Sequence, residues 1–193
     1  MTFRAFPRLF VPAITAFGLS SACSSAPPPA QAYVTTEIGS GGGAVCNTMG
    51  TTFSLGSATP NETVSRATGS GPIAIDCSVA ASGSNYNLAI DVTNSTMVVG
   101  QGGALSIQGT VNGTTGGTGI NASLNAGGVD YTESDCTIAF TFTLSNGLPP
   151  LPPSVESGRV WGHLDCPMAS AAESGQTSTC HVQADFVFEN CKE

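Results

Sequence analysis

The sequence predicts an all-β fold: an antiparallel β-sandwich of about eight to ten strands, stapled by disulfides. Three observations predict it. Apolar residues alternate with polar residues at a spacing of two in run after run, Gly- and Asn-rich turns separate the runs, and an even number of cysteines follows the N-terminal segment. Because no run of helical period intervenes between the predicted strands, an antiparallel sandwich is favoured over a βαβ fold.

The first 22 residues have the pattern of a signal peptide. Arg4 and Arg8 precede the apolar run 9–19, which is followed by small residues and then Cys23. A helix of this run would be about 17 Å long, well short of the roughly 30 Å hydrocarbon core of a bilayer. The segment therefore predicts export of the chain rather than a membrane span.

The end of this segment, Leu19-Ser20-Ser21-Ala22-Cys23, resembles the lipobox of bacterial lipoproteins. In that family a leucine and small residues precede a cysteine that is diacylated at sulfur and becomes the mature N-terminus. The leucine here lies one position further from the cysteine than in the usual lipobox. The resemblance implies a lipid anchor of palmitate type on Cys23 and a location in the bacterial cell envelope.

A second processing site offers an alternative. Ala30-Gln31-Ala32 matches an A-x-A cleavage site, and cleavage after Ala32 would release a soluble, secreted protein beginning at Tyr33. We favour lipidation because Cys23 directly follows the apolar run, whereas Ala32 lies well beyond it and behind three prolines.

Composition divides the exported chain into two parts. Residues 23–43 are rich in Ser, Pro, Ala and Gly, and they predict a flexible stalk. Residues 44–193 carry most of the alternating runs and predict one β-sandwich domain.

The predicted strands follow one another along this domain. The alternating runs lie at 53–55, 73–79, 86–92, 105–111, 120–124, 136–144, 160–166 and 180–188. Turn signals at Asn112-Gly113, Gly127-Gly128 and Asn146-Gly147 separate several of them. Residues 168–173 suggest a helical turn, and the Pro-rich segment 148–153 is expected to run extended.

Six cysteines remain once Cys23 is set aside: Cys46, Cys77, Cys136, Cys166, Cys180 and Cys191. In an exported protein such an even set predicts three disulfides, although the sequence leaves the pairing open. No C-x-x-C pair occurs, which disfavours a redox motif or a zinc ribbon. One hypothesis is that Cys166 pairs with Cys180 across the last hairpin.

That pairing would fix the register of the last two strands and bring the polar residues of both onto one outer face. The opposite pairs would then be Asp165 with His181, His163 with Gln183, and Trp161 with Asp185. The other face, with Val160, Leu164, Val182, Ala184 and Phe186, would pack in the core.

The polar face is a candidate ligand site. His163 and His181 could supply imidazole nitrogens, and Asp165 or Asp185 oxygens, to a metal ion, or Trp161 could stack on a sugar ring. We favour the simpler interpretation, a polar outer sheet face, because two histidines without a third close donor seldom make a tight metal site.

A weaker candidate for a metal is the acidic cluster Asp130, Glu133 and Asp135. Oxygen donors at this spacing can hold calcium in a loop, but the stretch lacks the EF-hand pattern and its glycine. We therefore expect a solvated loop and predict no metal.

The exported part of the chain is strongly acidic. It carries thirteen acidic residues against three basic ones, Arg66, Arg159 and Lys192, a net charge of −10. Because the three cations lie far apart in the sequence, we expect no binding to nucleic acid and no attraction to anionic lipid headgroups.

No motif indicates catalysis: the chain has no G-x-S-x-G, S-x-x-K, phosphate-binding loop or dinucleotide-binding pattern, and we expect no cofactor. We therefore expect a non-enzymatic, membrane-anchored lipoprotein whose domain contacts an envelope protein or a glycan. The alternatives are a carbohydrate- or metal-binding module that uses Trp161, His163, Asp165 and His181, and a secreted protein cleaved after Ala32.

Overall fold

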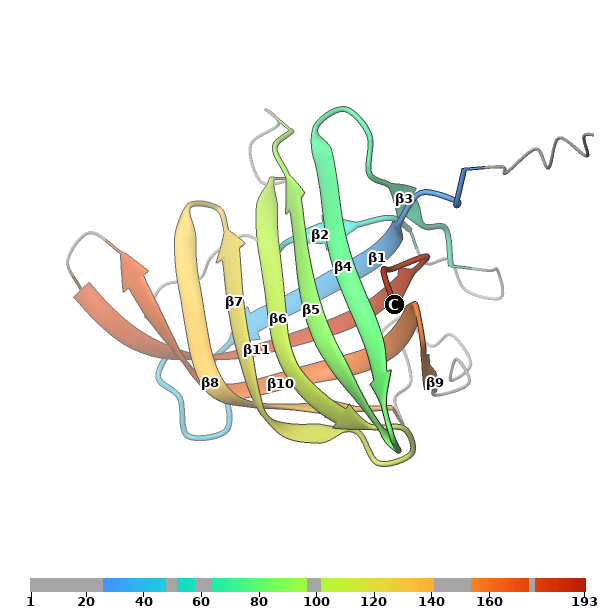
Figure 1. The fold of residues 1–193 in the computed structure, drawn as a ribbon. Helices are drawn as coiled ribbons and strands as arrows, with labels where there is room; N and C mark the ends of the chain where they lie inside the picture. Colours follow the sequence, from blue (N-terminus) through green and yellow to red (C-terminus); the bar gives the residue numbers. More distant parts are fainter. Residues whose placement is uncertain (1–25, 48–51, 58–63, 97–101, 141–153, 174–175) are drawn as a thin grey trace, which may run out of the picture.

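The computed structural model describes residues 26–47, 52–57, 64–96, 102–140, 154–173 and 176–193 (Figure 1). Within these ranges the chain is all β and antiparallel, and the prediction of an all-β, disulfide-bonded fold is confirmed. No helix in the described part is long and apolar enough to cross a membrane. The predicted signal peptide, Cys23 and the Pro-rich segment 148–153 lie outside the described residues.

Eleven strands of the described ranges form one sheet, and three of them, β1, β3 and β9, lie in none of the alternating runs predicted from the sequence. The strands are β1 (Gln31–Gly39), β2 (Ser54–Leu55), β3 (Ala67–Thr68), β4 (Ile73–Ser82), β5 (Asn85–Asn94), β6 (Gly103–Asn112), β7 (Gly117–Ala126), β8 (Val129–Ala139), β9 (Ser154–Glu156), β10 (Arg159–Glu173) and β11 (Gln176–Glu189). Their order in the sheet is β2-β1-β11-β10-β8-β7-β6-β5-β4, with β3 beside β1 and β9 beside β10.

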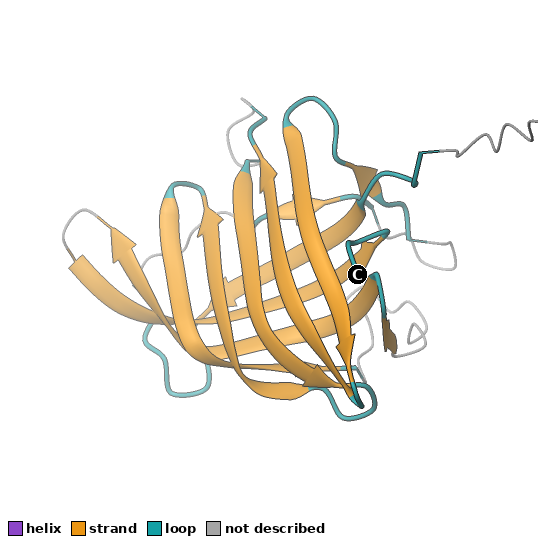
Figure 2. Ribbon diagram, in the orientation of Figure 1, coloured by secondary structure: helices purple, strands orange, loops and turns teal. Residues whose placement is uncertain are grey.

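The sheet folds over on itself into two layers. Strands β4 to β8 run across the strands β1, β10 and β11 at a steep angle, and the pairing of β8 with β10 joins the layers (Figure 2). The space between them holds one hydrophobic core, in which Phe53, Ile90, Leu105, Ile120 and Phe186 are almost completely buried. Each strand contributes its alternate apolar residues to this core, as period-two alternation requires.

Short turns connect β4 to β5, β6 to β7 and β7 to β8. Gly127 and Gly128 alone join β7 to β8, and both have positive φ, 61° and 84°. Tight two-residue hairpins need left-handed residues because their twist must match that of the flanking strands, and glycine adopts this conformation without a steric penalty. The Gly127-Gly128 turn predicted from the sequence is therefore confirmed.

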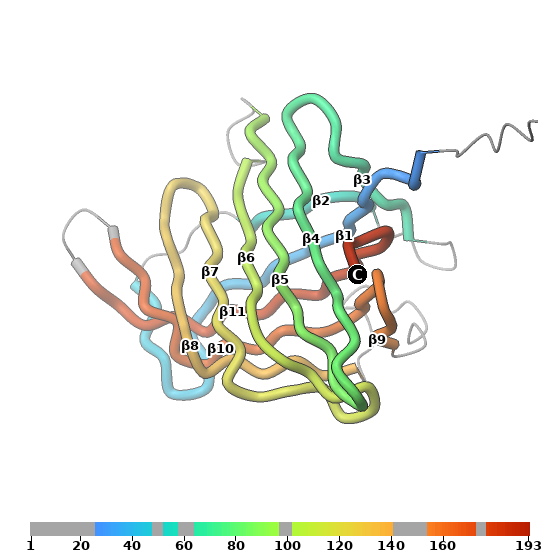
Figure 3. The backbone as a smooth tube through the Cα atoms, in the orientation of Figure 1, coloured from blue at the N-terminus to red at the C-terminus, as the bar shows by residue number. Residues whose placement is uncertain are grey.

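The C-terminal segment lies against the middle of the free edge of β4 (Figure 3). The Val79 amide donates to the Lys192 carbonyl and the Lys192 amide donates to the Cys77 carbonyl, both at 2.8 Å. A disulfide joins Cys77 to Cys191 at the same place. This part of the edge thus has a covalent and a hydrogen-bonded cover, which hinders its pairing with other chains.

All six cysteines in the described part of the chain form disulfides, but the hypothesis that Cys166 pairs with Cys180 is wrong. Cys166 pairs with Cys136 of β8, and Cys180 pairs with Cys46, which follows β1. A β-bulge between Cys166 and Ala169 shifts the register, so that Cys180 lies opposite Ala169. The β10–β11 hairpin therefore does not place the sulfur atoms of Cys166 and Cys180 next to each other.

The prediction of a flexible stalk over residues 23–43 is wrong for its central part. Residues 31–39 form β1, which pairs with β11 along its whole length, and Ala32 and Val34 are fully buried. The prolines before this segment and the glycines after it dominate the composition and mask its alternation of apolar and polar residues. The folded domain therefore begins at Gln31 and not at residue 44.

Two further local predictions are wrong, because pairing with neighbouring strands decides the conformation of both segments. Residues 168–173 belong to β10 rather than to a helical turn, and the acidic stretch 130–135 belongs to β8 rather than to a loop. Ser170 of β10 lies between Thr132 of β8 and Thr179 of β11. Pairing on both sides satisfies the backbone groups of these segments, and tertiary contact overrides their weak local propensity.

We predict that the Cys77→Ala/Cys191→Ala double variant loses about 2–5 kcal/mol of unfolding free energy in urea titrations, since this disulfide closes a long loop. Amide hydrogen exchange at β4 should also accelerate, because its edge loses its covalent cover. The matched control is Cys46→Ala/Cys180→Ala, which also opens a long loop but should leave exchange at β4 unchanged. Equal exchange at β4 in both variants would contradict the proposed role of the Cys77–Cys191 disulfide.

Candidate functional site

A strip of polar side chains, which we call the polar strip, runs over the outer face of β10 and β11. Alternation along the two strands turns the intervening residues, such as Leu164 and Val182, into the core. The strip therefore collects the ligand candidates predicted from the sequence on one face. It consists of Trp161, His163 and Asp165 from β10 and His181, Gln183 and Asp185 from β11.

The partners across the strip differ from those that the sequence predicted. His163 lies opposite Asp185, Asp165 opposite Gln183, and Trp161 opposite Val187. The register is shifted by two residues because the Cys166–Cys180 bond that was assumed to fix it does not form. A shift of two preserves the face on which each side chain lies, while a shift of one would have inverted it.

Hydrogen bonds connect the strip into one network. The imidazole Nδ1 of His163 lies 2.7 Å from the Oδ1 of Asp185, and the Nε2 of His181 lies 2.5 Å from the Oδ1 of Asp165. Between them, Gln183 donates from Nε2 to the Oδ1 of Asp165 at 3.1 Å and lies 3.5 Å from the Nε2 of His163. Each histidine is therefore oriented by a carboxylate, and the amide links the two pairs.

Electrostatics in the strip favour protonated His163. Its hydrogen bond to Asp185 is the main cause that raises the pKa of the imidazole, against a smaller opposing effect of burial. The charges of Asp185, Asp165 and Glu37 act in the same direction as the hydrogen bond. Asp185 is itself buried, so its charge is only weakly screened by water.

Trp161, the one tryptophan of the chain, is packed against two arginines. The guanidinium carbons of Arg66 and Arg159 each lie 5.3 Å from the centre of its ring, within cation–π range. The indole Nε1 is buried. The ring is therefore packed against charged side chains of the protein, which is not the open platform that stacking on a sugar requires.

The strip also lacks a preformed set of metal ligands. Among the described residues, one group of three donors lies within 4.8 Å of one another: Glu133, Cys136 and Cys166. The two sulfurs of this group form a disulfide with each other, so they offer no thiolate to a metal ion.

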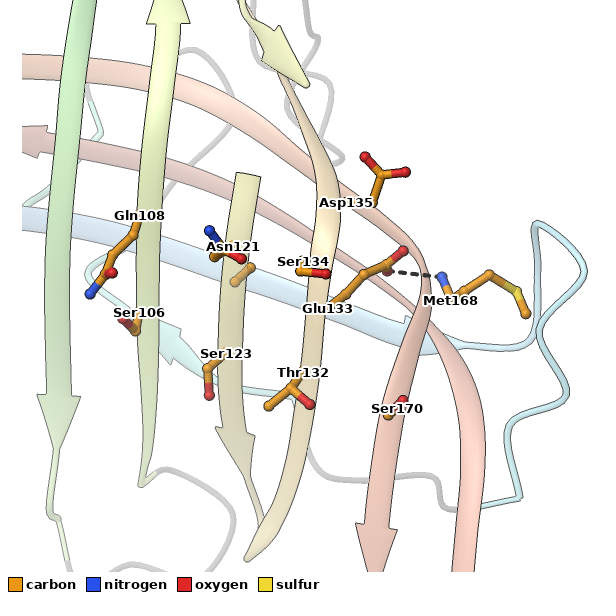
Figure 4. Close-up of a pocket in the computed structure, with 11 residues that line it drawn as sticks. Ser106, Gln108, Asn121, Ser123, Thr132, Glu133, Ser134, Asp135, Met168 and Ser170 are labelled. Carbon is orange, nitrogen blue, oxygen red and sulfur yellow. Dashed lines mark hydrogen bonds between the residues drawn. The ribbon is translucent and has the colours of Figure 1, made fainter. Parts of the chain in front are cut away.

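A second polar surface, which we call the polar groove, lies over β6, β7, β8 and β10 (Figure 4). It is an open depression of about 640 Å³. Its hydroxyl, amide and carboxylate groups can donate and accept hydrogen bonds but include no cationic side chain. The lining residues are Ser106, Gln108, Asn121, Ala122, Ser123, Thr132, Glu133, Ser134, Asp135, Met168 and Ser170.

Two of the three residues of the acidic cluster predicted from the sequence lie in the groove, and the third lies outside it. Glu133 and Asp135 line it, and the Glu133 Oε2 accepts a hydrogen bond of 2.9 Å from the Met168 amide at the bulge of β10. Asp130 lies outside the lining and accepts a hydrogen bond of 2.6 Å from Asn125. The three carboxylates therefore do not act as one ligand set.

Sequence reasoning missed the rest of the groove. Ser106 and Asn121 occupy the polar positions of their alternating strands, so their exposure on an outer face could have been predicted. Which polar faces lie side by side depends on strand order, and the order of β6, β7, β8 and β10 appears only in the folded sheet.

Comparison of the chain with known protein families, curated proteins and solved structures finds no match to any of them. The class of the protein is therefore defined by its own architecture: a two-layered, all-β domain with three disulfides and polar outer sheet faces.

We predict that the protein is more stable in mild acid than in mild base, because the pKa of His163 is raised in the folded state. A raised pKa stabilises the fold fully below the unfolded value of about 6.5, and this stabilisation is lost as the pH rises through the folded value. The check is the pH dependence of the urea midpoint. In His163→Gln and in Asp185→Asn the decline above pH 6.5 should be shallower, and an unchanged decline in both would contradict the prediction.

Proposed function

We propose that the protein is a non-enzymatic, lipid-anchored binding protein of the bacterial cell envelope. Its six described cysteines form three disulfides. Such bonds persist in oxidising compartments outside the cytoplasm, which supports export of the chain. The lipobox-like Cys23 supplies the anchor in this proposal, and the folded domain supplies the binding surface.

The position at which β1 begins is the main observation that supports an anchored protein rather than a secreted one. Cleavage after Ala32 would remove two residues of β1 together with their pairing to β3 and to the end of β11. It would also place a charged amino terminus on Tyr33, which is 4% exposed. Processing at Cys23 instead leaves every described strand intact and is therefore compatible with the fold. Cleavage after Ala32 is less compatible, because it would place an unpaired charge at a buried position.

The anchor would hold the domain close to the membrane. The Asn190 side chain donates a hydrogen bond of 3.1 Å to the Pro29 carbonyl, so the chain is already attached to the domain at Pro29. The six residue steps from Cys23 to Pro29 span at most about 20 Å. The tether is therefore much shorter than a stalk that reaches residue 43.

The binding surface in this proposal is the polar groove. Its mixed donors and acceptors suit a neutral, hydroxyl-rich or amide-rich partner, such as a glycan or a peptide segment of an envelope protein. The groove would repel an anionic partner, because the carboxylates of Glu133 and Asp135 line it.

A second candidate function is a metal-binding module at the polar strip, favoured by the presence of two imidazoles and two carboxylates in one network. Binding of an ion would require His163 and His181 to give up their carboxylate partners. We expect no saturable change in Trp161 fluorescence during titration with Zn²⁺. A saturable change in the parent protein that disappears in His163→Gln/His181→Gln would establish the second function in place of the first.

We predict that Cys23→Ser moves the protein from the membrane fraction of the producing bacterium to the soluble or precursor fraction. Intact mass spectrometry of the parent protein should give an N-terminal Cys23 that carries a diacylglyceryl group. The matched control is Ala30→Gln, which removes the A-x-A pattern and should leave the membrane fraction and the mass of the lipid unchanged. An unmodified N-terminus at Tyr33 in the parent protein would refute the proposal.

A further inference from the structure

The polar groove is built from two rows of side chains that cross four strands of the sheet. In the first row, each of β6, β7, β8 and β10 contributes one hydroxyl residue, which pairs with the hydroxyl residue of the next strand. We call this the hydroxyl row, and it consists of Ser106, Ser123, Thr132 and Ser170. Because neighbouring strands lie about 4.8 Å apart, the row is about 14 Å long.

The second row lies two residues further along the same strands, about 7 Å from the hydroxyl row. Gln108 of β6 pairs with Asn121 of β7. The register between β7 and β8 shifts here, so that Asn121 lies opposite both Ser134 and Asp135. Figure 4 shows the hydroxyl row and this second row side by side across the strands. A ligand that contacts both rows along their length therefore lies across the strands.

A β-bulge of β10 holds one end of the groove in place. Pro167 has no amide hydrogen to donate to β8, and the pairing of the two strands is interrupted at this point. The next amide, that of Met168, donates instead to the Oε2 of Glu133. Two disulfides flank the bulge, since Cys166 bonds to β8 and Cys180 bonds to the segment that follows β1. A site held in this way loses little conformational freedom when it binds a ligand.

The sheet offers no edge at the groove to which a peptide could add a strand. Each of β6, β7, β8 and β10 has a neighbouring strand on both sides, whereas a peptide that binds by strand addition needs an unpaired edge. Apolar side chains could anchor a peptide instead, but of the described residues that line the groove only Ala122 and Met168 are apolar. A glycan needs neither feature, because its hydroxyl groups donate and accept hydrogen bonds along both edges of each ring.

We infer that the polar groove binds an extended, neutral glycan that lies across β6, β7, β8 and β10, between the hydroxyl row and the second row. This inference rests on the proposed binding role of the groove. The serine and threonine hydroxyls can donate to and accept from sugar hydroxyls, and the amides of Gln108 and Asn121 can do the same. Asp135 only accepts, so it suits a sugar hydroxyl and repels an anionic glycan.

Affinity in this groove depends on the length of the ligand. None of the described residues that line it is aromatic, so stacking on a sugar ring does not contribute. Each hydrogen bond to the ligand replaces a bond to water and contributes a factor of only about five to binding. A chain that spans the hydroxyl row makes several such bonds at once, whereas a disaccharide makes few.

The test uses the full, isotope-labelled chain in detergent, with its three disulfides intact. The probe is chitohexaose, a neutral oligosaccharide whose hydroxyl and acetamido groups match the chemistry of the two rows. We expect saturable shifts in the amide NMR signals of the hydroxyl row, and binding of chitobiose that is weaker by about tenfold or more. Ser123→Ala/Thr132→Val removes two central hydroxyls at exposed positions and should weaken the binding of chitohexaose about tenfold.

The matched control is Ser82→Ala/Thr93→Val, which removes the same two groups at exposed positions of β4 and β5 outside the groove and should bind like the parent protein. Equal affinity of the two double variants, or of the two oligosaccharides, would overturn the inference. A neutral peptide of Gly, Ser and Asn is titrated in parallel. Shifts of the hydroxyl row with the peptide but not with chitohexaose would overturn the inference and leave the binding role of the groove in place, whereas no shift with either would overturn both.

Discussion

The pairing of β1 with β11 is the interaction on which the other features of the domain depend. It runs from Gln31 opposite Glu189 to Gly39 opposite His181, and it covers what would otherwise be a long free edge of the β10–β11 hairpin. Ala32 and Val34 complete the core against Phe186 and Phe188, at the price of ordering a segment whose flanks are rich in proline and glycine. β1 also carries β2 and β3, and with β3 it brings Arg66 to the end of the domain.

This pairing also connects the folded domain to the proposed anchor. Because β1 begins a few residues after Cys23, the proposed lipid anchor lies close in sequence to the first residue of β1. The polar groove is built from the opposite part of β10 and from β6, β7 and β8, which belong to the other layer. In our proposal, the anchor and the binding surface are therefore connected to different parts of the same sheet.

The polar strip lies between these two regions. Its two histidine–carboxylate pairs and the bridging Gln183 resemble a ligand site in composition, yet they satisfy one another across neighbouring strands. A hydrogen-bonded network of this kind stabilises the outer face of a sheet and makes it sensitive to pH. Its chemistry is explained by the demands of the fold, because Asp185 is buried and needs a partner.

The sequence by itself determined the all-β class, the three disulfides as a set, and the face on which Trp161, His163 and Asp165 lie. These properties follow from alternation along single strands and from the number of cysteines, both of which are local or compositional. Only the tertiary structure decided that Cys166 pairs with Cys136, that His163 meets Asp185, and that residues 31–39 form a strand beside β11. Each of these depends on strand order and register, which are set by packing between segments far apart in the chain and leave no periodic signal within any one of them.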